Sequence, residues 1–298
     1  MTKNGLAAIA RSCAVALIAL VQPYAWAALN DIYPGDYLPA AAGQNAFLVY
    51  AYDRNLDGLY SSGTNSDQFD RDTRMAVFLA ARYFDFHDMR MAVSASMGTA
   101  AQTTTNRALA TDAGIRGTTD PKFSVTLWPY MDTQAGHYVA LNLAHIVAWG
   151  SYDNTQSQNI GQNRDRSALS LAWAKQTSAR TLTEITAEFD RFGDNTRYGA
   201  ASARLEQRSA QSLTGFIRYQ ASDTLSPYVG AQWNAGGETI VNGVPLGDTL
   251  RSRRVYLGLR YSPDPTNIFH LRFAKDTEVV SGYGLQQEIV FRWTWLPK

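Results

Sequence analysis

The sequence has 298 residues, of which 45% are hydrophobic, 12% are aromatic and only 18% are charged. This charged fraction is below the roughly 25% of soluble domains, and the even spread of aromatic residues excludes long disorder. After residue 30, no apolar run reaches the roughly 18 residues that a spanning helix needs, which excludes a polytopic helical membrane protein. The net charge of +1 argues against an electrostatic nucleic-acid binder.

The N-terminus has the pattern of a secretory signal peptide. Lys3 and Arg11 precede the apolar run Cys13–Val21, and Ala25–Ala27 forms a small-x-small cleavage site. We expect residues 1–27 to be removed. Loss of Lys3 and Arg11 lowers the basic residues from 27 to 25 against 26 acidic residues, so the mature net charge is −1. The only cysteine is lost as well, which excludes a disulfide scaffold, thiolate catalysis and a cysteine metal site.

The rest of the chain shows alternation with a period of two residues, whereas helical periodicity is poor. Along residues 89–98, the odd positions read Met, Met, Val, Ala and Met, and the even positions read Arg, Ala, Ser, Ser and Gly. Twelve segments of this kind are predicted strands, at residues 45–54, 74–84, 89–98, 122–129, 138–149, 166–175, 180–190, 208–219, 227–234, 252–261, 268–275 and 284–295. Their lengths suit tilted strands that span a membrane in about 9–11 residues.

The gaps between the predicted strands also alternate in length. Five gaps have four to eight residues, and the intervening gaps mostly have 16 to 23, except for a last gap of eight. Short turns on one side and long loops on the other are typical of outer-membrane barrels. Aromatic residues suited to an interfacial girdle lie near the strand ends, at Tyr83, Trp128, Trp149, Tyr219, Tyr261, Trp293 and Trp295.

Backbone groups in lipid have no water to bind, so every strand must be paired on both sides. We therefore predict an all-β fold for residues 45–298: a monomeric, transmembrane up-and-down antiparallel β-barrel of about 12 strands, in the bacterial outer membrane. A soluble secreted all-β protein is the alternative.

The residues that face the lumen would carry the function. If the apolar set of each strand faces lipid, the inward set is rich in arginine and aromatic rings, which suit carboxylates and flat solutes. The predicted substrate path is Arg82, Arg90, Trp128, Phe216, Arg218, Arg254, Tyr256, Arg260, Arg272 and Arg292. The inward set also contains Arg74, Phe78, Phe84, Lys122, Glu184, Glu188 and Glu288. The alternative is that these charges pair across the lumen merely to fill a narrow barrel.

Residues 28–44 precede the first predicted strand. Two prolines and two glycines within Ile32–Gln44 are incompatible with the core of a strand. This segment is expected to be either a periplasmic tail or a plug in the lumen.

Two patches of the sequence resemble the phenol meta-pathway MetA transporter family. One is the run Pro34–Tyr37 followed by Asn45–Tyr50, and the other is Gly117–Phe123 with a Trp-Pro pair downstream at residues 128–129. The resemblance implies an outer-membrane barrel for passive uptake, associated with degradation of aromatic or other hydrophobic compounds. Unlike typical barrel proteins, which end on an aromatic residue, this chain continues with Leu296-Pro297-Lys298.

Such a barrel would have small hydrophobic or aromatic solutes, outer-membrane lipids, lipopolysaccharide and the barrel-assembly machinery as partners, and no nucleic acid. We expect no catalytic residue and no cofactor. A lipid hydrolase would need a Ser–His pair, but none of His87, His137, His145 and His270 has the His-x-Ser spacing of outer-membrane phospholipases, and alternation aims His145 at lipid. Adhesion through the long outer loops is a further alternative.

A calcium loop is considered at Asp53–Gly58, which matches the first six positions of an EF-hand loop. The twelfth position, which should be a bidentate glutamate, is Thr64. We therefore expect no metal site. No phosphate-binding glycine loop is present either, so transport would follow the solute gradient.

Overall fold

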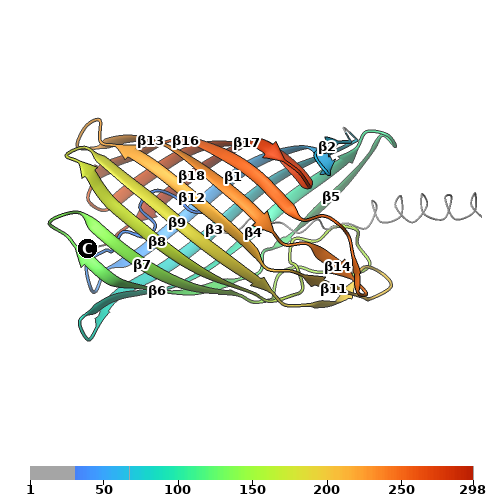
Figure 1. Cartoon of the computed structure of the whole chain (residues 1–298), viewed down its shortest axis with the longest axis horizontal. Coiled ribbons are helices and arrows are strands. Elements are labelled where there is room, and N and C mark those ends of the chain that lie inside the picture. The colour runs from blue at the N-terminus through green and yellow to red at the C-terminus, as the bar shows by residue number, and fades with distance from the viewer. Residues whose placement is uncertain (1–30, 67, 298) are drawn as a thin grey trace, which may run out of the picture.

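The computed structural model describes residues 31–66 and 68–297, and this part of the chain is built from β-strands and loops (Figure 1). The predicted signal peptide, residues 1–27, lies outside the described residues. Among the described residues, no helix has the length and apolar character to cross a membrane.

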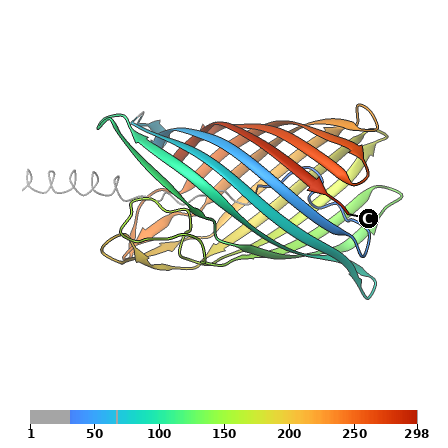
Figure 2. The ribbon, with the colours of Figure 1, turned by 180° about the vertical axis from the view of Figure 1, so that it is seen from behind.

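Twelve long strands form one closed antiparallel sheet (Figure 1 and Figure 2). They are β1 (Asn45–Ser61), β3 (Phe69–Phe86), β4 (Met89–Asn106), β6 (Lys122–Asp132), β7 (His137–Ile146), β8 (Arg166–Ser178), β9 (Thr181–Phe192), β12 (Ala210–Tyr219), β13 (Leu225–Gly236), β16 (Leu250–Asp264), β17 (Asn267–Val279) and β18 (Gly282–Trp295). Each strand pairs with the next one in this order, and β18 pairs with β1 to close the barrel. The prediction of an up-and-down barrel of twelve strands is confirmed.

The long connections carry six short strands: β2 (Thr64–Asn65), β5 (Thr111–Thr118), β10 (Asn195–Tyr198), β11 (Ala203–Gln207), β14 (Thr239–Val241) and β15 (Val244–Pro245). Four of these, β10, β11, β14 and β15, form a separate small sheet. The C-terminus lies at the opposite end of the barrel, among the short turns (Figure 1). We name the end with the short turns the inner end and the end with the long loops the outer end, after the arrangement of outer-membrane barrels.

Burial alternates along the strands as a barrel in lipid requires. On β9, the even positions from Leu182 to Phe192 are buried, and most of the odd positions are exposed. The exposed set is apolar on the neighbouring strands too, with Leu143, Leu169 and Phe189 all about half exposed on the outer surface. The buried set is largely polar or small. This inversion of a soluble core agrees with a barrel whose outer surface faces lipid.

Aromatic rings gather at the inner end. Phe47 stacks on Trp295 with 5.5 Å between the ring centroids, and Tyr261 stacks on Phe269 with 6.4 Å. Trp293 donates a hydrogen bond from its indole nitrogen to the Asn267 side chain over 3.0 Å. Rings with one apolar body and one polar atom are suited to a membrane interface.

Strand β3 departs from the predicted facing. Its buried positions are odd, at Arg71 and Thr73, whereas Arg74, Phe78 and Arg82 are exposed. The prediction that the even positions, including Phe84, face the lumen is therefore wrong. Both sets of alternate residues on β3 contain apolar side chains, so hydrophobicity does not determine the facing. Pairing with β1 determines it, because it places Phe78 against outward-facing Val49.

Candidate functional site

Residues 31–44 are here called the inner segment, and its residues from Asp31 to Ala40 line a cavity inside the barrel (Figure 1). The segment turns sharply at Pro34-Gly35. Asp36 donates its backbone N–H to the Tyr33 carbonyl over 3.1 Å, and Tyr33 donates its own to the Asp36 carboxylate over 2.9 Å. Proline followed by a residue with positive φ is the pattern of a type II turn, and Gly35 has a φ of 92°. The turn carries Tyr33 into the barrel interior, where its side chain is only 1% exposed.

Three arginines of the barrel wall, here called the arginine cluster, bind the carboxylates of this segment. They are Arg54 on β1, Arg272 on β17 and Arg292 on β18. Asp31 is paired with Arg54 and lies 3.3 Å from Arg272, and Asp36 is paired with Arg292. A wall carboxylate, Glu288, also pairs with Arg54 and lies 2.8 Å from Arg272.

The ring of Tyr33 contacts two of these cations. The Arg272 guanidinium carbon is 3.9 Å from the ring centroid, and that of Arg292 is 4.6 Å from it. Tyr50 adds a tilted ring with 5.7 Å between centroids, and Tyr256 lies 4.8 Å from the Arg272 guanidinium. Contacts between a guanidinium and an aromatic face are attractive and gain strength where water is excluded.

Further hydrogen bonds join the inner segment to the wall. The Gly35 N–H donates to Glu184 over 2.7 Å, and the Trp128 indole donates to the Tyr37 carbonyl over 2.8 Å. Arg90 donates to the Ala40 carbonyl. The segment is thus bound to several strands around the barrel, by ion pairs at its start and by neutral and mixed hydrogen bonds further along.

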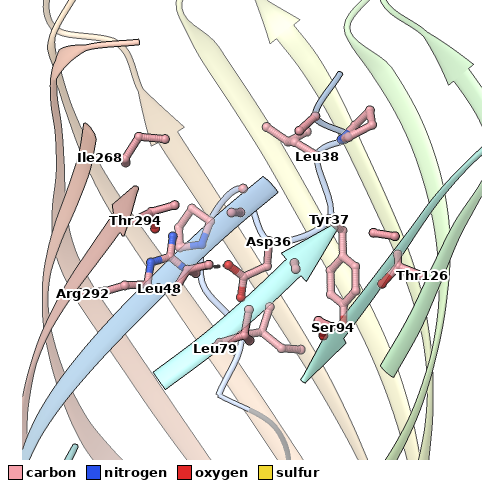
Figure 3. Close-up of a pocket in the computed structure, with 18 of the residues that line it drawn as sticks. Asp36, Tyr37, Leu38, Leu48, Leu79, Ser94, Thr126, Ile268, Arg292 and Thr294 are labelled. Carbon is pink, nitrogen blue, oxygen red and sulfur yellow. Dashed lines mark hydrogen bonds and ion pairs between the residues drawn. The ribbon is translucent and has the colours of Figure 1, made fainter. Parts of the chain in front are cut away.

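Two cavities lie against the inner segment. The one toward the inner end has a volume of about 400 Å³ and is lined by Asp36, Tyr37, Trp128, Arg260 and Arg292 among others (Figure 3). The one toward the outer end has a volume of about 230 Å³ and reaches the outer loops. Both cavities are lined by the start of the segment at Asp31. A single-ring solute fits the inner cavity, but the segment lies between the two.

Nine of the ten residues predicted for the substrate path face the lumen. These are Arg90, Trp128, Phe216, Arg218, Arg254, Tyr256, Arg260, Arg272 and Arg292. The exception is Arg82, which follows the reversed facing of β3 and donates to the Gly43 carbonyl over 2.5 Å and to the Asn45 side chain over 3.0 Å. Whether a solute uses the nine stays a prediction.

The structure brings some of these residues together and separates others. Phe216 and Tyr256 are in ring contact at 5.5 Å, and Arg272 and Arg292 share Tyr33. Arg254 is instead paired with Asp276 at 2.7 Å. Pairing within the wall is what we expect if the charges merely fill a narrow barrel. The lumen therefore contains both paired wall charges and residues grouped around the inner segment.

Sequence reasoning missed several members of the site. Tyr50, Tyr52 and Arg54 occupy even positions of β1 and face inward. Both sets of alternate residues in 45–54 contain apolar side chains, so the alternation does not indicate which set faces the lumen. Asp31 and Asp36 lie in a segment without strand periodicity, for which the sequence predicts a tail or a plug but indicates no contacts.

The connection between β7 and β8, residues 147–165 and here called the outer loop, lies at the other end of the barrel and contacts its inward face. Its Gln158 accepts hydrogen bonds from Gln102 and Thr104 on the inward face of β4, over 2.7 and 2.9 Å. Asp120 accepts the N–H groups of Gly150 and Gln162, over 2.7 and 2.8 Å. Burial raises the pKa of the Asp120 carboxyl above its ordinary value, although these two N–H groups oppose the shift.

On the lipid-facing surface, pairing of β7 with β8 places His145 opposite Ser167. The His145 Nδ1 atom is 3.0 Å from the Ser167 Oγ, and the Asp165 carboxylate is 3.9 Å from the His145 Nε2. The outward aim of His145 agrees with its alternation. The Ser–His pair, however, was not found by sequence spacing, since cross-strand partners are distant in sequence. No group of three or more potential metal ligands occurs within residues 31–66 and 68–297.

Comparison with known proteins gives one family and several barrels. A family model described as "Putative MetA-pathway of phenol degradation" matches residues 56–288. The COG4313 outer membrane channel from Pseudomonas putida F1 has a TM-score of 0.85 at 18% identity, over 90% of this chain and 100% of that chain. The transport unit of the autotransporter AIDA-I from Escherichia coli has a TM-score of 0.55 at 11% identity, over 94% and 95%. No curated protein matches the sequence. At these identities the solved structures support the fold, which is that of outer-membrane barrels.

Proposed function

Because the chain belongs to the phenol-degradation MetA family, we propose that it is an outer-membrane channel for passive uptake of small hydrophobic or aromatic compounds. The similar barrel from Pseudomonas putida F1 is described as an outer membrane channel, which supports this reading. Such a protein would reside in the bacterial outer membrane after removal of residues 1–27, in contact with its lipids and lipopolysaccharide, and would be inserted by the barrel-assembly machinery.

One observation carries the proposal: the lumen contains a cavity of about 400 Å³ whose lining includes both aromatic rings and arginines. Tyr83 and Trp128 line it with their rings stacked at 5.8 Å. Arg218 and Arg260 line it with guanidinium groups. Stacked rings favour flat solutes, and guanidinium groups bind carboxylate or hydroxyl oxygens.

Uptake into proteoliposomes tests the proposal. We expect aromatic solutes such as 4-hydroxybenzyl alcohol and 4-hydroxybenzoate to enter faster than into protein-free liposomes. Ser94 lines the cavity, so Ser94→Trp should reduce this uptake by filling the space. Its neighbour Ala95 faces outward, and Ala95→Trp should leave uptake unchanged. Uptake no faster than in protein-free liposomes would refute the channel.

A second candidate function, lipid hydrolysis, is favoured by the Ser167–His145 pair. It lies beside an apolar groove on the outer wall that Leu143, Leu169 and Phe189 line. A histidine that accepts a serine proton can activate the hydroxyl for attack on an ester. Covalent labelling by a serine-directed phosphonate, absent in Ser167→Ala, would support this function. Wild-type protein that remains unlabelled in lipid would exclude it.

A further inference from the structure

We infer that the arginine cluster is a binding site for aromatic carboxylates, which the inner segment occupies as an internal substitute. The inference rests on the proposed function and narrows its solute class. It follows from three features of the described residues: the charge of the wall without the segment, the position of the Tyr33 ring, and the buried donors that the segment leaves without partners.

The barrel wall alone carries an excess of positive charge at this point. Arg54, Arg272 and Arg292 provide three cations, and the wall carboxylate Glu288 is paired with Arg54 and Arg272. The inner segment supplies the two missing anions through Asp31 and Asp36. The side chains of Arg54, Arg272 and Arg292 are at most 5% exposed. Because uncompensated charges in such surroundings are strongly unfavourable, departure of the segment requires another anion to take its place.

The segment also supplies an aromatic ring. The Tyr33 ring contacts the Arg272 and Arg292 guanidiniums, at 3.9 and 4.6 Å, and lies within 5.7 Å of the Tyr50 ring. A solute that replaces the segment therefore meets two stacked guanidinium faces beside carboxylate-binding N–H groups. An aromatic ring with a carboxylate satisfies both requirements in one small molecule, whereas an aliphatic acid or a neutral phenol satisfies only one.

Some buried hydrogen-bond donors at the arginine cluster have no acceptor among the described residues. Among the described residues, the Tyr33 hydroxyl and the Nε atoms of Arg272 and Arg292 are buried without a hydrogen-bond partner. Buried donors without partners carry an energetic cost. A planar carboxylate can accept from a guanidinium through both of its oxygens, so a free ligand can satisfy donors that the tethered Asp36 leaves unused.

The inner cavity gives a solute access to this site. Arg292 lines both the cavity and the ring-binding position, and Figure 3 shows its ion pair with Asp36 at the cavity wall. Arg218 and Arg260 line the same cavity and would attract an anion to it. Exchange then requires only that the solute carboxylate replace the Asp36 carboxylate on Arg292, with no covalent step.

The experiment compares two probes that share one ring. 4-Hydroxybenzoate carries the carboxylate and 4-hydroxybenzyl alcohol does not. In the full barrel in micelles, Asp31→Asn with Asp36→Asn removes the competing anions, so calorimetry should show about tenfold tighter binding of 4-hydroxybenzoate. Hydrogen exchange in residues 31–40 should quicken when that probe is added to the wild type. Binding of the alcohol should not change in the double variant.

Asp53→Asn is the matched control, because Asp53 is an exposed β1 carboxylate whose partner Arg74 lies outside the lumen. If the double variant does not fold, Asp36→Asn alone provides the test, with a smaller expected gain in the same direction. Equal changes for both probes, or no change for the benzoate, would overturn the inference. Uptake of the alcohol in that case would leave the proposed channel intact, whereas absence of uptake for both probes in every variant would refute the channel itself.

Discussion

The inner segment and the outer loop both contact the inward face of the barrel wall, but different forces hold them. Asp31 and Asp36 attach the inner segment to arginines through ion pairs that are largely buried. The outer loop is held by neutral groups. Its Gln158 side chain accepts a hydrogen bond from Gln102 on β4, and its Gly150 and Gln162 N–H groups donate to Asp120. The contacts of the inner segment and those of the outer loop should therefore respond to different ligands.

An anion can compete with the inner segment for the arginine cluster, because it offers carboxylate oxygens like those of Asp31 and Asp36. It gains less at the outer loop, where the donors to Asp120 are neutral backbone N–H groups and not guanidinium cations. The loop is also fixed by close packing at Gly161, where a Cβ would lie 2.7 Å from the Gly150 carbonyl carbon. We therefore expect solute-dependent opening at the inner end.

The largest expected effect comes from removing a cation that serves both the segment and the wall. Arg272→Met leaves Asp31 and Glu288 with Arg54 as their shared partner, in a position that is fully buried. Loss of one member of a buried charge network costs about 3–5 kcal/mol. Urea unfolding of the barrel in micelles should show a loss of this size. The outer loop should keep its hydrogen-exchange protection below the unfolding transition.

The control for this variant is Arg74→Ala. Arg74 is 83% exposed and its nitrogen lies 3.4 Å from Asp53 on the outer surface. Exposed pairs contribute about 0–1 kcal/mol, so the free energy of unfolding should change little. A loss as large as that of Arg272→Met would contradict the assignment of the buried network as the main electrostatic contribution.

The barrel itself could be predicted from the sequence because lipid imposes a simple rule on its outer wall. The facing was predictable where only one of the two alternating sets is apolar, as on β16, where Val255 and Leu257 are exposed and Tyr256 is buried. On β3 both sets are apolar in part, and the register with its neighbours decides. A bulge in β18 likewise places Leu285 inside, although alternation would place it outside.

The site was less predictable than the barrel. Its wall cations follow from alternation, so Arg272 and Arg292 were found. Their partners Asp31 and Asp36 belong to a segment without strand periodicity, and the position of such a segment depends on pairing over more than 200 residues of sequence. The Ser167–His145 pair has the same origin, since only the register of β7 with β8 joins these two residues.

A smaller effect is expected at the outer loop. Asp120→Ala removes the acceptor of two N–H groups, so local opening around Gly150 and Gln162 should become easier by about 1–3 kcal/mol. Hydrogen exchange measured peptide by peptide gives this value. Asp120→Asn keeps one side-chain oxygen and should lose less. Equal exchange in all three proteins would show that Asp120 does not hold the loop.

The stability that Asp120 gives to the outer loop depends on pH with a defined sign. Burial raises the pKa of Asp120 in the folded protein, so its protonated form is favoured there relative to the unfolded chain. The stability that this group contributes is full below its unfolded pKa and is lost as pH rises through the raised pKa. Mild acidification should therefore not reduce protection of the outer loop through Asp120. A loss of protection near Gly150 on acidification, absent in Asp120→Asn, would contradict this sign.

The smallest expected effect distinguishes Arg90 from Arg82, which the sequence alone predicts to line the same substrate path. Arg90 faces the lumen and donates to the Ala40 carbonyl of the inner segment, whereas Arg82 lies outside and donates to Asn45 and to the Gly43 carbonyl at the end of the segment. Arg90→Ala should loosen the end of the inner segment and lower the preference for 4-hydroxybenzoate over 4-hydroxybenzyl alcohol. Arg82→Ala should change this preference less, because its guanidinium lies on the outer face and contacts the segment at Gly43, near the start of β1. If uptake ratios in proteoliposomes shift equally for both variants, the inner end responds to net charge at its rim, and the inner segment has no special part in selection.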